Sequence, residues 1–415
     1  MEQTYYLIII GALIVEYLLS TISSVLNMNS ITKTVPDGFQ EFYDNEKYSK
    51  SQEYLKDKTK LGLYSGAFSL ILTLIVIEFG LFGILDEFVR SNSTHHIISG
   101  LMFFGVLFFV NDILNIPFTL YGTFVIEDKY GFNKTTIRTF ITDKLKGYGL
   151  TIVFGSIIMS PVLYFFSTYE SNGWWIAWAL ITCFMIAIQP LFVHVIAPMF
   201  NKFTPLEEGE LRTAIDNFAN KVNFPIGRID VMDGSRRSAH SNAYFSGFGK
   251  SRRIALFDTL LDKHSTEEIV SVVAHEIGHY KKKHIITGTI LGIIETGIIL
   301  YIFNIFMNDR ALFSVFSVEM IPTSIQTYCG LVFFGMLYSP VSLLTSIFTT
   351  AMSRKNEFEA DSYALETTKK PEPLISMLKG LAASNLSHLT PHPLMVFLTY
   401  SHPPVTDRIA AVQNK

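Results

Sequence analysis

The stretch Ala274-His275-Glu276-Ile277-Gly278-His279-Tyr280 places two histidines four residues apart, with a glutamate next to the first. It follows Ser265-Thr266-Glu267-Glu268, a capping-box pattern that begins a helix. Residues four apart share one face of a helix, so both imidazoles can bind one Zn²⁺. Glu276 can then reach a water molecule on that metal. The alternative is a surface helix with two ordinary histidines, and the rest of the chain has to decide between them.

The composition indicates a membrane protein. Of 415 residues, 49% are hydrophobic and 17% are charged, whereas soluble proteins carry about a quarter charged residues. The net charge of −3 gives no support to a nucleic-acid partner. Cys183 and Cys329 lie in apolar runs without metal-site spacing, so we expect buried thiols and no disulfide framework.

Seven apolar runs are long enough to span a bilayer. They are Tyr5–Leu26, Leu61–Leu85, Ile97–Ile126, Gly149–Phe166, Trp174–Met199, Ile285–Met307 and Thr327–Ala351. Lys and Arg are concentrated in every second connecting segment, and such segments stay in the cytoplasm. We therefore expect the N-terminus outside, with Met199–His284 and the C-terminal region on the cytoplasmic side.

Four acidic residues, Glu16, Glu78, Asp112 and Glu295, lie inside these runs. Ionisable groups are costly in hydrocarbon and usually face a protein interior or water. Because the runs contain no matching Lys or Arg, the acids favour a water-filled chamber walled by the helices. Hydrogen bonds between helices are the alternative.

The segment between the fifth and sixth spans has the pattern of a small soluble domain. We expect a helix over Leu206–Val222, strands at Arg228–Met232, Asn242–Phe248 and Arg253–Phe257, and a turn at Gly247 and Gly249. The motif helix then runs through Lys281–Lys283, read as interface anchors, into the sixth span, either continuously or through a hinge. This places the metal at the cytoplasmic side of the membrane.

A catalytic zinc needs a third protein ligand. The helix that begins at Ser353, just after the seventh span, offers Glu357, with Asp361 one turn later to orient a histidine. From the pattern alone, two interpretations of Glu357 carry equal weight: a metal ligand, and a solvated acid at the start of a helix. Glu359 points to another side of the helix and is the weaker candidate.

A further polar cluster follows in Tyr400–Pro404. His402 can donate to the oxyanion formed on a scissile carbonyl, and Arg408 can pair with a carboxylate of the site. His388 and His392 are interpreted as exposed loop histidines.

Taken together, these motifs resemble the type 1 CAAX prenyl protease family, which are membrane zinc endopeptidases. The resemblance covers nearly the whole chain. It is carried by Lys47–Tyr54, Tyr130–Lys134, His240–Phe245, Ile254–Leu260, the HEIGH motif, Asn356–Asp361 and Tyr400–Arg408. Glu359 stands where relatives often have glutamine.

The resemblance implies a mainly α, polytopic fold, in which seven transmembrane helices form a barrel around a water-filled chamber. A cytoplasmic zincin-like α+β protease domain with a small β-sheet completes it. It also implies one zinc ion held by His275, His279 and Glu357, with Glu276 as the base. Asn242 and Ala243, on an edge strand, would align the substrate. The chain divides accordingly into 1–199, 200–284, 285–351 and 352–415.

The implied substrate is a protein with a prenylated C-terminal CAAX box, from which three residues are removed. A general quality-control protease of membrane proteins is the alternative. A transporter would leave the metal motif, Glu357 and the large cytoplasmic insert unexplained, and it predicts an internal repeat that the sequence does not show. We expect a monomer, in the endoplasmic-reticulum membrane of a eukaryote or the inner membrane of a bacterium.

Overall fold

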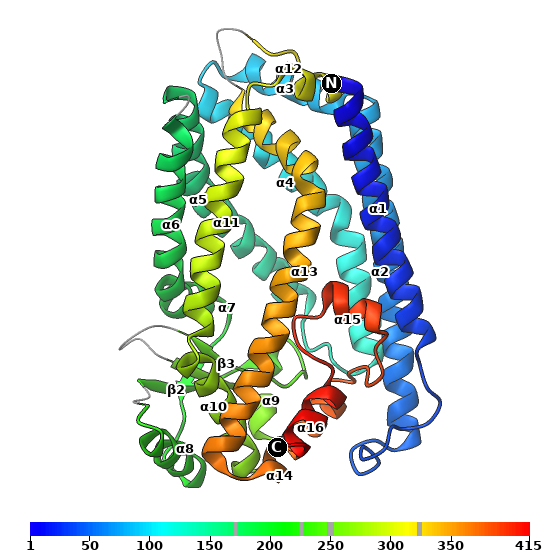
Figure 1. Cartoon of the computed structure of the whole chain (residues 1–415), viewed down its shortest axis with the longest axis vertical. Helices are drawn as coiled ribbons and strands as arrows, with labels where there is room; N and C mark the ends of the chain where they lie inside the picture. The colour runs from blue at the N-terminus through cyan, green and yellow to red at the C-terminus, as the bar shows by residue number, and fades with distance from the viewer. Residues whose placement is uncertain (170–171, 225–226, 247–252, 322–325) are drawn as a thin grey trace.

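The computed structural model describes residues 1–169, 172–224, 227–246, 253–321 and 326–415. Within these residues, seven helical segments are long and apolar enough to cross a membrane, which confirms the expected number. Together they form the long upper part of the molecule (Figure 1). They are α1 (Glu2–Asn29), α2 (Asn45–Glu78), α4 (His96–Tyr121) with η1 (Gly122–Glu127), α5 (Ile137–Thr168), α6 (Gly173–Leu191) with η3 (Phe192–Ile196) and α7 (Ala197–Phe200), α11 (His284–Phe306) and α13 (Thr327–Thr368).

The membrane helices surround a chamber. Only 6–17% of the residues in their most apolar windows are buried. In a solid bundle each helix would bury a broad apolar stripe against its neighbours. A ring of helices leaves the inner face accessible as well as the lipid face, and it accounts for this low burial. The hollow barrel expected from the resemblance is thus confirmed.

The membrane helices begin and end at different residues from the apolar runs that predicted them. Helix α2 starts at Asn45, capped by Asp44, and ends before Gly80, whose φ of 61° turns the chain into α3 (Leu81–Asn92). The predicted run Leu61–Leu85 therefore covers the end of one helix and the start of another. Helix α5 starts at Ile137, twelve residues before the predicted run, because Thr136 caps a polar first half.

The expectation that the intramembrane acids lack basic partners was wrong for Asp112. Lys144 lies within α5 and not in a loop, and its Nζ is 2.5 Å and 2.7 Å from the two carboxylate oxygens of Asp112. Tyr148 donates to the same carboxylate. Glu78 accepts a hydrogen bond from Tyr6. Pairing between helices, the alternative reading, thus accounts for two of the four acids.

The soluble part contains a four-stranded sheet in the order β1-β2-β4-β3. Strands β2 (Arg228–Met232) and β4 (Arg253–Phe257) agree with the prediction and pair in parallel, whereas β1 (Phe203–Pro205) was missed. Strand β3 (Ala243–Ser246) pairs antiparallel with β4 and forms one edge. The predicted end of this strand beyond Ser246 and the turn at Gly247 and Gly249 lie outside the described residues.

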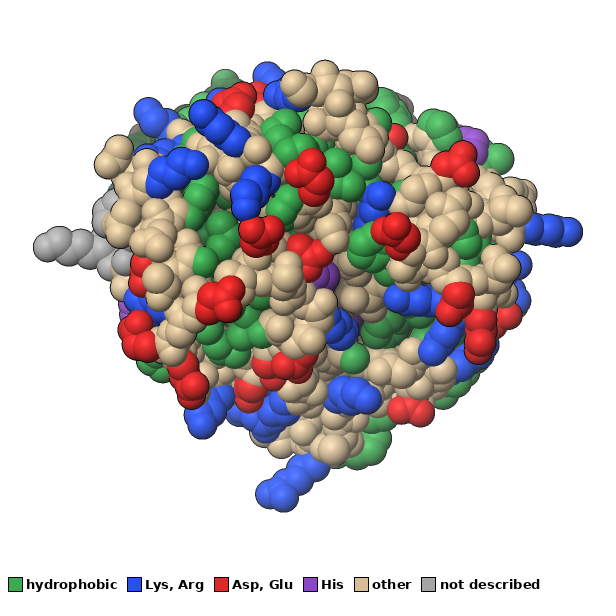
Figure 2. Space-filling view, turned by 90° about the horizontal axis from the view of Figure 1, so that it is seen from below, with side chains coloured by type: hydrophobic (Ala, Val, Ile, Leu, Met, Phe, Trp, Pro, Cys, Tyr) green, Lys and Arg blue, Asp and Glu red, His purple; other side chains and the backbone are tan. Residues whose placement is uncertain are grey.

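Helices pack around the sheet and join it to the barrel. They are α8 (Glu210–Lys221), α9 (Asp258–Leu261), α10 (Thr266–Lys281), α14 (Pro371–Ser384), α15 (Pro393–Thr399) and α16 (Val405–Gln413); η4 (Gly234–Arg236) is a 3₁₀ turn, and α12 (Arg310–Val315) lies at the opposite end of the molecule (Figure 1). Ile229, Leu256, Val273 and Ile277 belong to their shared apolar core. Figure 2 shows charged side chains of both signs over this end of the molecule, as expected for a face in water.

Candidate metal centre

The HEIGH motif lies on α10, as expected. Ser265 accepts from the Glu268 amide, and the Glu268 side chain accepts from the Ser265 amide, which confirms the capping box. Helix α10 ends at Lys281, and Lys283 has a φ of 61° before α11 begins at His284. The motif helix is therefore joined to the sixth span by a hinge. This turn sets the direction of α10, and with it the direction of His275 and His279, relative to α11.

Helix α13 brings Glu357 to the two histidines. Its Oε1 is 3.3 Å from His279 Nε2, and its Oε2 is 3.5 Å from His275 Nε2. The two Nε2 atoms are 3.1 Å apart. One donor atom from each residue falls within 4.8 Å of the others, so the three side chains could hold a metal ion.

Gly278 permits this approach of the two helices. A Cβ atom on Gly278 would lie 3.1 Å from both the Cα and the carbonyl oxygen of Ala360, and 3.2 Å from the Cβ of Tyr363. These distances are shorter than ordinary contacts, so only glycine lets α10 lie this close to α13. The glycine of the motif thus determines the distance from the histidines to Glu357.

Asp361 and Arg408 hold the first histidine in place. Asp361 Oδ1 is 2.9 Å from His275 Nδ1, which directs Nε2 of the same ring toward Glu357. Arg408 donates to both oxygens of Asp361, at 2.8 Å and 2.6 Å, and its Nη1 is 3.3 Å from Glu357 Oε2. Burial lowers the pKa of His275, but bonding to Asp361 and Glu357 outweighs it and raises the pKa to about 9. The carboxylates of Asp361 and Glu357 therefore favour a positive charge at the position of His275.

His284 supports the second histidine, a role that the sequence analysis does not predict. Its Nδ1 is 2.9 Å from Nδ1 of His279, and its Nε2 is 3.2 Å from Glu359 Oε2. Because Glu359 can only accept as a carboxylate, His284 donates from Nε2 and accepts at Nδ1. His279 then donates from Nδ1, which leaves its Nε2 lone pair for a metal. Glu359, expected to be the weaker ligand candidate, lies outside the cluster and contacts His284 instead.

Glu276 lies between the cluster and the sheet edge. Burial raises the pKa of its carboxyl group, and the backbone of Phe245 on β3 forms a hydrogen bond with it. Asn242 is exposed just before this strand, and Ala243 pairs with Leu256 of β4 on the inner side. A raised pKa suits a group that accepts and returns protons near neutral pH.

His402 and Arg408 reach the cluster from the C-terminal segment. The Nε2 of His402 is 3.5 Å from Glu357 Oε1, and its side chain is 64% exposed. It is therefore free to contact another molecule at the centre. Arg408 is mostly buried between Asp361 and Glu357.

The expectation for His388 and His392 was wrong, because both are partly buried. Ser30 Oγ lies 3.2 Å from His388 Nε2, and burial lowers the pKa of His388 to about 4. His392 accepts from the Leu394 amide and caps α15. The backbone amide of His392 also donates to Asn27 on α1, so both residues tie the C-terminal segment to the rest of the fold.

A second polar cluster lies beside the metal centre, and the sequence analysis does not predict the contacts within it. Tyr54 donates to Glu127 at 2.5 Å, and His240 Nε2 is 3.3 Å from the other oxygen of Glu127. The Asn385 side chain accepts from the Ser241 amide at 3.0 Å and donates to the Ser241 carbonyl at 3.1 Å. Two motifs of the sequence, Lys47–Tyr54 and His240–Phe245, thus meet at one place, which only tertiary structure could show.

The donor set fits zinc. Two imidazole nitrogens and one carboxylate oxygen are the ligands of a catalytic site that keeps a position open for water. Glu357 is buried beside the two imidazoles, with Oε2 3.5 Å from His275 Nε2 and 3.3 Å from Arg408 Nη1. A buried carboxylate next to two imidazole nitrogens is a donor set that a divalent cation can share. The fold and this centre together define a membrane metallopeptidase.

Comparison with known proteins places the chain in a family. Residues 25–202 match the model described as CAAX prenyl protease N-terminal, five membrane helices, and residues 205–415 match peptidase family M48. CAAX prenyl protease 1 of Saccharomyces cerevisiae is 32% identical, covering 98% of this chain and 94% of the relative. The homologue from Oryza sativa is 34% identical, covering 92% and 90%.

A solved structure agrees. The crystal structure of S. mikatae Ste24p superposes with a TM-score of 0.91 at 32% identity, covering 98% of each chain. The chain therefore belongs to peptidase family M48, in the branch with the CAAX protease N-terminal membrane domain. The suspected family is confirmed.

Proposed function

We propose that this protein is an integral-membrane zinc metalloendopeptidase that removes the C-terminal tripeptide from prenylated CAAX proteins. The observation that carries the proposal is the convergence of His275, His279 and Glu357 beside Glu276 in a chain similar over its full length to CAAX prenyl proteases. One Zn²⁺ per chain is the expected metal, in a protein expected to act as a monomer.

His275, His279 and Glu357 would hold the zinc ion. When bound, zinc supplies Lewis acidity, which polarises a carbonyl and lowers the pKa of water toward neutrality. Glu276 takes the proton from the attacking water and passes it to the leaving amine. Its raised pKa, caused by burial, favours this exchange.

The remaining residues align substrate and transition state. His402 is exposed beside the cluster and donates to the oxyanion as it forms. Arg408 acts by positioning Asp361 and Glu357 through the contacts described above. Ala243 starts the edge strand β3 and Asn242 directly precedes it, and an extended peptide adds to this edge as a further strand.

The proposed orientation has the N-terminus outside and the metal centre at the cytoplasmic side. It is supported by the Lys and Arg in alternate loops and by the charged face around the soluble part (Figure 2). In this orientation the metal centre is open to proteins of the cytoplasm. The endoplasmic-reticulum membrane is the expected location in a eukaryote, and the inner membrane in a bacterium.

The test compares a farnesylated CAAX peptide with its unprenylated twin. Purified protein is incubated with each, and the products are identified by mass spectrometry, with Glu276→Gln as the inactive control. We expect the farnesylated peptide to be cleaved after its prenylated cysteine, and the twin to be cleaved far more slowly. Equal cleavage of both peptides would support the general membrane peptidase instead.

A further inference from the structure

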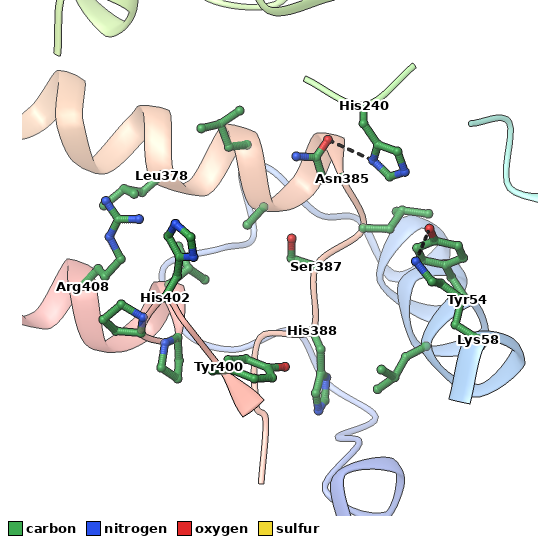
Figure 3. Close-up of a pocket in the computed structure, with 17 residues that line it drawn as sticks. Tyr54, Lys58, His240, Leu378, Asn385, Ser387, His388, Tyr400, His402 and Arg408 are labelled. Carbon is green, nitrogen blue, oxygen red and sulfur yellow. Dashed lines mark hydrogen bonds between the residues drawn. The ribbon is translucent and has the colours of Figure 1, made fainter. Parts of the chain in front are cut away.

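A pocket of about 500 Å³ opens directly beside the metal centre. Figure 3 shows His402 and Arg408 at one end and Tyr54 and Lys58 at the other, with Asn385 and His388 between them. Leu378, from the same wall, is apolar. Pockets of this size hold small ligands and short peptides. The metal-centre end and the Lys58 end are thus connected by one partly apolar space.

Two permanently charged side chains, Lys58 and Arg408, line this pocket together with three histidines. Both charges are positive, and none of the described lining residues is acidic. Glu127 does not line this pocket, and its carboxylate is bonded to Tyr54 and His240. Lys58 Nζ donates to Tyr54 at 3.2 Å and is 3.5 Å from Glu127, and its side chain is 55% exposed. Among the described lining residues, Lys58 is the exposed cation at the end opposite His402 and Arg408 (Figure 3).

The sheet edge points a bound peptide into this pocket. A peptide that pairs antiparallel with β3 has its carboxyl end beside the residues that precede Asn242. Those residues are Ser241, fixed by the paired bonds to Asn385, and His240, which lines the pocket. Three extended residues span about 10 Å, so a short carboxyl-terminal segment ends within the pocket.

We propose that this pocket receives the three carboxyl-terminal residues of the substrate and that Lys58 binds their terminal carboxylate. The proposal rests on the proposed function. It explains why the cut falls three residues before the end of the substrate chain. The apolar wall takes the aliphatic side chains. The ammonium group selects a free carboxylate over a chain that continues.

The experiment uses two farnesylated peptides that differ only in a C-terminal carboxylate or carboxamide. Binding is measured by fluorescence anisotropy, with the label at the amino end, on zinc-loaded full-length Glu276→Gln protein, so that no cleavage is required. We expect the carboxylate peptide to bind roughly tenfold more tightly, as for a charge-assisted hydrogen bond. Adding Lys58→Gln should bring the ratio close to one, and Lys58→Arg should preserve most of it.

Lys56→Gln is the matched control, because Lys56 is exposed on the same helix and does not line the pocket. It should keep the full ratio. Equal binding of the two peptides by the parent protein, or a ratio that survives Lys58→Gln, overturns the proposal. Failure of the proposed function is seen separately, as absence of cleavage of either peptide by protein with Glu276 intact.

Discussion

Substituting Gly278 by alanine should disturb the metal centre without touching a ligand. The added Cβ would lie 3.1 Å from the Cα and the carbonyl oxygen of Ala360, and 3.2 Å from the Cβ of Tyr363. None of these atoms can move aside by a side-chain rotation. Helix α10 must therefore shift from α13 by a few tenths of an ångström, which is what ordinary contact at 3.4 Å or more requires.

The size of the effect follows from two opposing terms. Overpacking of a tight contact costs about 1–3 kcal/mol, whereas alanine gains about 1 kcal/mol over glycine inside a helix. The net loss of stability is thus about 0–2 kcal/mol. Metal ligands tolerate displacements of only about 0.2 Å, so zinc affinity should fall by roughly tenfold or more.

Zinc affinity is measured by competition with a chromogenic chelator, and stability by thermal unfolding in detergent. Gly288→Ala on α11 is the control, because its Cβ would have nothing within 4 Å. It should leave zinc affinity unchanged. If Gly278→Ala bound zinc as tightly as the wild type, the close packing of α10 on α13 would not set the ligand geometry, and the reasoning would fail.

Three further substitutions test the groups around the centre. His284→Ala should weaken zinc binding about 10–100-fold, measured by chelator competition, because His279 loses the acceptor at its Nδ1; unchanged affinity would refute that role. Asp361→Ala should lower the unfolding free energy by about 3–5 kcal/mol, because Arg408 loses its closest carboxylate; a wild-type denaturation midpoint would contradict this. Burial lowers the pKa of His388 to about 4, so the unfolded chain takes up the proton first, and stability falls as the pH drops from about 6.5 toward 4. His388→Gln should remove this part of the acid sensitivity in thermal melts, and an identical pH dependence would exclude it.

The sequence predicted those features that depend on local patterns. The capping box at Ser265 and the strands at Arg228–Met232 and Arg253–Phe257 are set by neighbours along the chain, as are the long apolar runs. Where helices begin was harder to predict, because polar residues continue a membrane helix beyond the lipid. Lys144 lies outside the apolar run that begins at Gly149, although it belongs to α5 and pairs with Asp112.

The contacts of the metal centre could be predicted only in part. The spacing of His275 and His279 is local, but Glu357 becomes a ligand candidate only once α10 and α13 are known to pack together. The bond between His279 and His284 depends on a left-handed turn at Lys283, a lysine and not a glycine, which no sequence rule anticipates. The Asn385 contacts with Ser241 join residues 144 positions apart and have no local signal.

The most direct test of the central claim is a paired measurement on Glu276→Gln protein, namely its zinc content and its cleavage of a farnesylated CAAX peptide. Glu276 lies beside the ligand cluster but outside it, so we predict one zinc ion per chain, as in the wild type, and no detectable cleavage. A Glu276→Gln protein that still cleaved the peptide, or an active wild type that contained no zinc, would contradict the account.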